Sequence, residues 1–278
     1  GLVGSEMCIR DRPTASIVVL SCNRLAYLRS TLESLFATTP RNECELIVVD
    51  NGSTDGSADA LRRLAEQGDV DKVILRKSNH GTAPGFNTGF AYSDPSSRYV
   101  IKLDSDITLL TPGWLARFDA FVRKFPDTGM LTLYQVNNYR MMTSPCDQVG
   151  DEKVISWNWW PIGSACMTIP RAVFKQLGYF CEDYKIKYIW DDVDYSKRLF
   201  LMGKRAYYLK GTHAFHRDDL DTDYRSFKEL KARELPPSRK LQKDIYREYA
   251  IGERDISIFY PYYENCVFPT GERLIEID

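Results

Sequence analysis

Short apolar, β-branched runs alternate with helical patterns in the first half of this chain, and that alternation limits the fold more than any other feature. The runs lie at residues 16–21, 45–50, 72–77, 99–104 and 129–134. Most of them are continuously apolar, as strands are when helices cover both faces of their sheet. Between them, leucine and phenylalanine recur at helical spacing. The pattern predicts an α/β fold with a mostly parallel, Rossmann-like sheet flanked by helices.

The second half of the chain continues this pattern less regularly. We expect a strand at 164–170, a helix ending near Gly178, a helix from about Asp191 to Met202, and a strand at 205–209. Residues 135–161 lack periodicity, which predicts a long functional loop. A helix before the fifth strand is expected to begin behind a Thr111 cap, with Pro112 in its first position.

These patterns divide the chain into three expected segments. Residues 1–12 (GLVGSEMCIRDR) fit no pattern that follows, and we expect them to be a non-native leader. Residues 13–218 form the expected α/β domain. Residues 219–278 are charged and helical, then aromatic around 259–263, and are expected to form a C-terminal extension.

Composition excludes several kinds of partner and location. The 37 Lys and Arg residues balance 38 Asp and Glu residues, so no overall basic field points to nucleic acid. The seven cysteines are widely spaced without a metal-binding pattern, and we expect buried thiols in a reducing compartment. No apolar run reaches the roughly 18 residues that span a bilayer. We therefore expect a cytoplasmic chain without a transmembrane segment, and leave peripheral contact with the inner membrane open.

A polar turn, residues 50–55, follows the second predicted strand at its carboxyl end, where open α/β sheets bind ligands. Ser53, Thr54 and Asp55 are ordinary turn formers, and capping of the next helix is the preferred interpretation for them. Asp50 differs, because a carboxylate at the end of an apolar strand is costly unless it is used. We expect it to accept hydrogen bonds from a nucleobase or ribose.

Asp104-Ser105-Asp106 ends another apolar strand. Two carboxylates this close repel each other unless a cation lies between them or one of them binds a sugar hydroxyl. Oxygen ligands of this kind suit Mg²⁺ or Mn²⁺, which would bridge a diphosphate. Two of the three histidines follow a predicted strand, and one of them would complete the metal site. His216 is the first choice and His213 the alternative.

Three carboxylates, Asp191, Asp192 and Asp194, open a predicted helix. Acidic residues in a first helical turn are favoured by the helix dipole and cap free amides, but one would suffice for that. The excess indicates that at least one faces a cleft, where it would remove a proton from an attacking hydroxyl. Successive helical residues differ by about 100° in direction, so Asp191 and Asp192 should not face the same pocket.

Taken in order, these features resemble glycosyltransferase family 2, with its GT-A nucleotide-diphospho-sugar transferase fold. The resemblance covers about residues 15–218. Its motifs lie at residues 17–24, 47–57, 79–89, 104–106, 163–180 and 190–198. It implies a metal-dependent, inverting glycosyltransferase of the hexosyltransferase class, which moves a sugar from a nucleotide-sugar donor to a glycan or lipid-linked acceptor in polysaccharide biosynthesis.

The resemblance also assigns roles to residues that match the motifs. Asp192 would be the catalytic base, with Asp191 beside it, and Asp106 would bind the divalent metal. The donor-binding candidates are Asn23, Asp50, Asn87 and Asp104, of which Asp50 would contact the nucleobase and Asp104 the ribose or the metal.

Some positions depart from the family pattern. Ser21 and Cys22 stand where many members carry proline and an aromatic residue, and Phe86 stands where many carry arginine. The resulting Gly-rich segment at 79–89 leans towards rhamnosyltransferase-like members.

The sequence leaves two alternative functions open. One is a nucleotidyltransferase on a related fold, and the other is a non-catalytic nucleotide-sugar-binding module. Trp157, Trp159 and Trp160 would form either a stacking platform for an acceptor sugar or part of the core.

Overall fold

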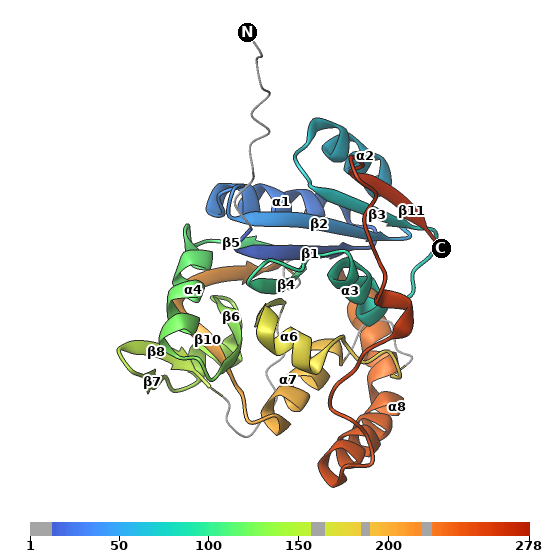
Figure 1. The fold of residues 1–278 in the computed structure, drawn as a ribbon. Helices are drawn as coiled ribbons and strands as arrows, with labels where there is room; N and C mark the ends of the chain where they lie inside the picture. The colour runs from blue at the N-terminus through green and yellow to red at the C-terminus, as the bar shows by residue number, and fades with distance from the viewer. Residues whose placement is uncertain (1–12, 157–164, 185–189, 218–223) are drawn as a thin grey trace.

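The computed structural model describes residues 13–156, 165–184, 190–217 and 224–278 (Figure 1). The described strands form one sheet in the order β11-β3-β2-β1-β4-β9-β6-β10-β8-β7, with β5 paired to β10. Among these strands only β5, β8 and β9 run against the common direction. The predicted α/β fold with a mostly parallel sheet is confirmed.

The elements have the following bounds. The strands are β1 (Ala15–Ser21), β2 (Cys44–Asn51), β3 (Lys72–Arg76), β4 (Tyr99–Asp104), β5 (Ile107–Leu109), β6 (Thr128–Gln135), β7 (Asp147–Val149), β8 (Glu152–Ile155), β9 (Cys166–Pro170), β10 (Arg205–His216) and β11 (Leu274–Ile277). The helices are α1 (Leu25–Thr38), α2 (Ser57–Gln67), α3 (Thr82–Ala91), α4 (Trp114–Lys124), α5 (Tyr139–Thr143), α6 (Arg171–Leu177), α7 (Asp191–Leu201) and α8 (Tyr224–Ile251), with a 3-10 turn, η2 (Pro261–Tyr263).

Three expectations about local structure need correction. The strand expected at 205–209 continues to His216, because its second half pairs with β5 and, after a bulge, with β6. Helix α4 begins at Trp114 behind Gly113. Thr111 instead accepts a hydrogen bond from the backbone N–H of His213, at 2.8 Å. The segment expected to be a long loop holds α5 and the β7–β8 hairpin, which are too short to give a periodic pattern.

Helices cover both faces of the sheet (Figure 1), and apolar side chains form a core on each face. Leu28 of α1, Leu61 of α2 and Phe118 of α4 belong to the core on one face. The other core contains side chains of α3, α6 and α7, among them Phe86 and Tyr195. The beginning of α7 and the carboxylates that it carries therefore lie on the same face of the sheet as α3.

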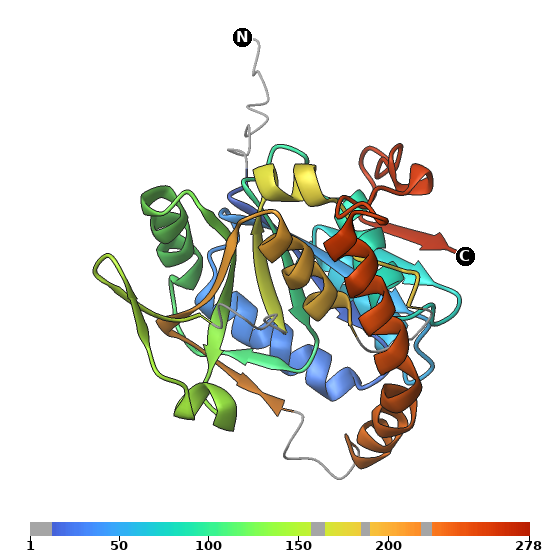
Figure 2. The ribbon, with the colours of Figure 1, turned by 90° about the horizontal axis from the view of Figure 1, so that it is seen from below.

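The C-terminal extension is joined to the rest of the fold. Ile245 and Tyr249 of α8 cluster with Cys181 and Tyr184, and α8 lies alongside α7 in Figure 2. Strand β11 pairs with β3 and forms the outer edge of the sheet. The boundary between residues 218 and 219 remains a prediction, although the last residues contribute to the sheet. No helix in the described part of the chain is long and apolar enough to cross a membrane.

The described cysteines are free thiols, but not all of them are buried. Cys44, Cys166 and Cys181 are buried as expected, whereas Cys146 is exposed. Burial raises the pKa of Cys166 to about 12 and that of Cys181 to about 11. These two thiols are therefore protonated at neutral pH and protected from oxidation.

Substitution of Gly89 tests the close approach of α3 to the sheet. A Cβ atom at Gly89 would lie 2.3 Å from Cγ1 of Val18, a stiff side chain in the core. Gly89→Ala should therefore lower the free energy of unfolding by about 1–3 kcal/mol, measured by urea denaturation. Gly85→Ala is the matched comparison, because it meets the flexible end of Leu20 and should cost less. Equal stability of the wild type and Gly89→Ala would contradict this packing.

Candidate active site

The parallel strands bring the candidate polar residues to one edge of the sheet. Asp50 is the second-last residue of β2, and Asp104 is the last residue of β4. Strand β1 lies between these two strands. Asn23 follows β1, Asp106 lies in the turn between β4 and β5, and His216 ends β10. Residues that are far apart in the sequence thus lie at one edge of the sheet, as expected for the carboxyl ends of parallel strands.

Asp106 is contacted by two basic side chains. β5 pairs with β10 so that His216 lies opposite Ile107, the residue after Asp106. His216 Nε2 is 3.3 Å from Asp106 Oδ1, and Arg24 Nη1 is 3.2 Å from Asp106 Oδ2. Asn137 fixes the backbone at this point, because its side chain exchanges two hydrogen bonds with the peptide of His216.

His213 occupies a different position. It lies three residues before His216 in β10, so its side chain points to the opposite face of the strand. Its ring packs edge-on against Tyr134, with the centroids 5.8 Å apart. The structure therefore brings His216, and not His213, next to Asp106, while a metal-binding role for either histidine stays a prediction.

The lysine in the middle of β4, Lys102, is a site residue that the sequence analysis missed. It is 3% exposed, and its Nζ lies 3.1 Å from Asp104 Oδ1 and 3.5 Å from Asp191 Oδ2. Burial opposes the charge on Lys102, but Asp104, Asp191 and Asp192 outweigh it and raise its pKa. A lysine inside the apolar run of residues 99–103 was the available signal, since such a charge is costly unless it is paired.

The same contacts act on Asp104. Burial raises its pKa to about 6, Lys102 opposes that shift, and the charges of Asp106 and Asp191 add to it. Asp104 therefore belongs to a group of interacting charges that extends from the end of β4 to the beginning of α7.

The three carboxylates of α7 have different surroundings. Asp191 is 5% exposed and faces Lys102. Asp192 is partly exposed and its Oδ1 accepts a hydrogen bond from the backbone N–H of Val193. Asp194 is fully buried, with its carboxylate 2.8 Å from Arg198 Nε and 2.6 Å from the hydroxyl of Tyr184. Of the three residues, Asp192 is the one that is partly exposed.

Arg198 explains why Asp194 is buried. Its guanidinium donates to Asp194 and to the carbonyl oxygens of Leu177, Tyr179 and Ile256. One buried side chain therefore joins α7 to the end of α6 and to the C-terminal extension. Because its donors are matched by several acceptors, the ion pair can be accommodated in the core.

Hydrogen bonds join Asn23 to the turn after β2. Asn23 Oδ1 accepts a hydrogen bond from the backbone N–H of Thr54 at 2.7 Å, and Ser53 Oγ accepts one from the N–H of Asn23. Asp55 accepts from the N–H groups of Leu25 and Ser57, at the beginnings of α1 and α2. The helix-capping role expected for this turn is therefore fulfilled by Asp55, while Ser53 and Thr54 support Asn23.

Asp50 is buried, and one of its two carboxylate oxygens lacks a hydrogen-bond partner among the described residues. It is 1% exposed, and its Oδ1 accepts the backbone N–H of Ser53 at 2.9 Å. Its Oδ2 is buried and has no hydrogen-bond partner among the described residues. Burial raises the pKa of Asp50, and Ser53 opposes the shift. A carboxylate oxygen in this situation calls for a donor group from beyond the described residues, because an unsatisfied buried acceptor is costly.

The side chain of Asn87 forms hydrogen bonds within the protein. It is fully buried, and its side chain donates to the carbonyl of Phe180 and to Glu182 Oε1 and accepts from the N–H of Phe180. These bonds fasten α3 to the segment that precedes α7. A direct contact of Asn87 with a donor stays a prediction, and its burial favours a supporting role.

The fit of the site to a divalent metal is partial. Within the described ranges, no group of three or more His, Cys, Asp or Glu side chains is arranged to hold a metal ion. Asp106 and His216 supply an oxygen and a nitrogen ligand that face each other. A metal bound by these two residues would need its other ligands from water and a diphosphate, which is common for Mg²⁺.

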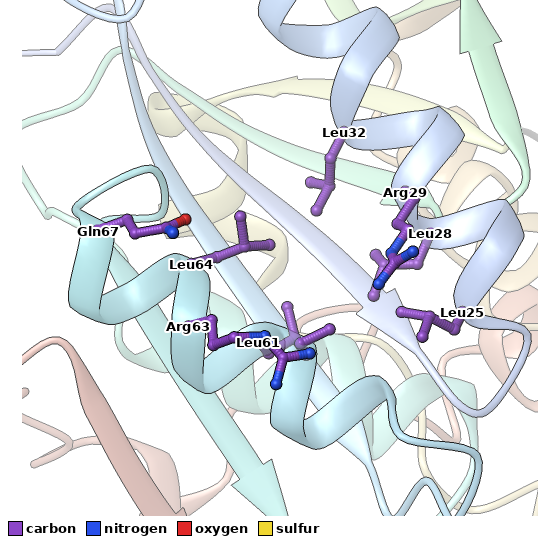
Figure 3. A pocket seen from close by; sticks show the side chains of 9 residues that line it. Leu25, Leu28, Arg29, Leu32, Leu61, Arg63, Leu64 and Gln67 are labelled. Carbon is purple, nitrogen blue, oxygen red and sulfur yellow. The ribbon is translucent and has the colours of Figure 1, made fainter.

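A separate pocket lies between α1 and α2 (Figure 3). Its lining consists mostly of leucines, with Arg29 and Arg63 among the labelled side chains. None of the candidate carboxylates or histidines lines it. Trp157, Trp159 and Trp160 lie outside the described residues.

Residues 16–178 match the model for "Glycosyl transferase family 2", so the chain belongs to that family.

Named relatives match between a third and three quarters of this chain, and a smaller part of their own length. The O-antigen biosynthesis protein RfbC of Myxococcus xanthus is 25% identical over 230 residues, which are 76% of this chain and 18% of that protein. The uncharacterized glycosyltransferase alr2836 of Nostoc sp. is 33% identical over 91 residues, which are 33% of this chain and 27% of that protein. The chain therefore spans about a fifth to a quarter of these relatives.

Solved structures share the fold. The mannosyltransferase PcManGT from Pyrobaculum calidifontis, in complex with GDP-Man and Mn²⁺, aligns with a TM-score of 0.64 and 21% identity over 91% of this chain and 67% of that one. S. aureus TarS 1-349, in complex with UDP-GlcNAc, aligns with a TM-score of 0.56 and 18% identity over 80% of this chain and 66% of that one. At this identity the likeness establishes the GT-A fold.

The different surroundings of the α7 carboxylates predict different effects on stability. Asp194→Asn leaves the buried guanidinium of Arg198 without its counter-ion and should lower the free energy of unfolding by about 3–5 kcal/mol, measured by urea denaturation. Asp192→Asn, at a partly exposed position, should change it by less than about 0.5 kcal/mol. If the two variants were equally stable, the buried network would not support α7 as described.

Proposed function

We propose that this protein is an inverting glycosyltransferase that moves a sugar from a nucleotide-sugar donor to a hydroxyl of a glycan or lipid-linked acceptor by single displacement. The observation that carries the proposal is the arrangement of carboxylates around Lys102. Asp104 lies on the strand-end side and Asp191, next to the accessible Asp192, lies on the α7 side. An acid–base group and an electrostatic donor site are the two parts that such a displacement needs.

The nucleotide would bind along the strand ends. The unsatisfied Oδ2 of Asp50 is suited to accept a hydrogen bond from a nucleobase N–H or a ribose hydroxyl. Asn23 and Asp104 would complete the donor side, with Asn87 supporting it from behind. The Gly-rich segment at 79–89, which resembles that of rhamnosyltransferase-like members, adds a rhamnosyl donor to the panel to test, beside GDP-Man and UDP-GlcNAc, with which the two solved structures are in complex.

Asp106 and His216 would hold a divalent metal, Mn²⁺ or Mg²⁺. A bound metal would offset the charge that develops on the departing nucleoside diphosphate. The cationic side chain of Arg24 contacts the same carboxylate, so Arg24 would have to yield part of Asp106 to the metal.

On the acceptor side, Asp192 would accept the proton of the attacking hydroxyl. This residue is partly exposed, whereas Asp191 is held by Lys102 and Asp194 by Arg198. The catalytic base must be reachable by the acceptor, and this requirement favours Asp192 among the three.

Family membership makes a nucleotidyltransferase the less favoured alternative, and the intact carboxylates argue against a non-catalytic module. A role in polysaccharide biosynthesis is suggested by the O-antigen biosynthesis protein among the relatives. A cytoplasmic location with peripheral contact at the inner membrane remains a prediction. Release of pyrophosphate instead of a nucleoside diphosphate during turnover would favour the alternative enzyme.

Metal dependence can be tested by calorimetric titration with UDP and GDP. Asp106→Asn and His216→Ala should weaken nucleotide binding in Mn²⁺ by about tenfold or more, because each removes a ligand. His213→Ala is the matched control and should bind as the wild type does. If a chelator left nucleotide binding and turnover unchanged, the metal assignment would be wrong.

The base is tested by steady-state kinetics with a nucleotide sugar that binds. Asp192→Asn keeps the shape of the side chain but removes the proton acceptor, so kcat should fall by about 10² to 10⁴ while donor affinity stays nearly constant. Exposed Asp69, changed to Asn, controls for the loss of one negative charge. A fully active Asp192→Asn enzyme would exclude this role.

A further inference from the structure

Lys102 is a charged residue in a place where the fold otherwise buries apolar ones. Its strand, β4, lies between β1 and β9 in the interior of the sheet, and its neighbours Ile101 and Leu103 are fully buried. We propose that Lys102 is a positioning residue, which ties Asp191 at the beginning of α7 to Asp104 at the end of β4 and so sets where Asp192 stands relative to the donor. This inference rests on the proposed function for the roles of Asp104 and Asp192.

The geometry of β4 places the three groups together. Val100, Lys102 and Asp104 alternate onto the same face of the strand, the face that α3 and α7 cover. The ammonium group lies 5.1 Å from the centroid of the Phe86 ring on α3, which closes one side of it. It also contacts the carboxylates of Asp104 and Asp191, at 3.1 and 3.5 Å. Asp104 and Asp191 come from elements far apart in the sequence and share this one cation.

The balance of charges explains how Lys102 holds Asp104 and Asp191 together. Asp191 is 5% exposed, and Asp104 also faces Asp106, so the carboxylates at this point would repel one another. The ammonium group of Lys102 lies between Asp104 and Asp191 and offsets their repulsion at close range. Loss of that cation would leave Asp191 as a buried carboxylate without its counter-ion, which is strongly unfavourable.

Because Asp191 and Asp192 are consecutive residues, the position of one affects the position of the other. Asp191 is the first residue of α7, and Asp192 is the next one. Movement of Asp191 away from β4 would therefore move the base, and a displacement of about 1 Å at a reacting group can cost about 100-fold in rate. Lys102 need not touch either substrate to have this effect.

The experiment compares Lys102→Met, Asp191→Asn and the double variant with the wild type. Methionine keeps the length and apolar stem of the side chain and removes the charge. Three quantities are measured: the midpoint of urea unfolding, amide hydrogen exchange in α7, and kcat and KM for the nucleotide sugar. Val100→Ile, on the same face of β4, controls for a change in packing.

A positioning role predicts three results. Lys102→Met unfolds at lower urea concentration, and the double variant unfolds closer to the wild type than the sum of the single changes, because the uncompensated carboxylate is gone. Amide exchange at the first turn of α7 becomes faster in Lys102→Met. kcat falls by about 10- to 100-fold at nearly constant KM for the donor. The double variant should regain stability without regaining kcat.

Two results would overturn the proposal. One is additive effects of the two substitutions on the unfolding midpoint, which would mean that Lys102 and Asp191 do not interact. The other is wild-type kcat in a Lys102→Met variant, which would limit Lys102 to a structural role. If the wild type released no nucleoside diphosphate from any donor tried, the proposed function would fail, and the unfolding and exchange data would still decide whether Lys102 ties α7 to β4.

Discussion

The common direction of the parallel strands is the constraint on which the rest of this structure depends. Because β1, β2, β4 and β10 all end at the same edge, the polar residues at their ends gather there, while the middle of β1 and β2 is apolar. Asp50, Asp104 and His216 are brought together in this way, although more than 160 residues separate the first from the last. The core and the site are thus made by the same strands, and the site occupies the part of each strand that the helices leave uncovered.

Concentrating carboxylates at one edge creates a repulsion that the fold must offset. Three basic side chains do so at different depths. Arg198 holds Asp194 inside the core, Lys102 holds Asp104 and Asp191 together at the base of the site, and Arg24 contacts Asp106 nearer the surface. The deepest of these pairs supports the fold, and the outermost is the one that a ligand or metal can most easily replace.

The sequence predicted the fold well, because the β-branched runs and the residues at their ends follow from local pattern alone. It predicted that Asp50 and Asp106 end apolar strands and that His216 lies nearer the carboxylates than His213. What it could not predict depends on pairing between distant segments. The extension of β10 requires β5 as a partner, the burial of Asn87 requires residues 180–182, and the position of Lys102 requires α7 to pack above it. In a single sequence these partners leave no periodic signal.

The central claim is that the strand-end carboxylates bind the donor while Asp192, on α7, activates an acceptor on the opposite side of the transferred sugar. The most direct measurement is the anomeric configuration of the product, determined by proton NMR with a nucleotide sugar that the protein turns over. Single displacement predicts that the configuration at the anomeric carbon is inverted relative to the donor. Retention of the donor's configuration would contradict the account, since it requires a different arrangement of groups around the reacting carbon.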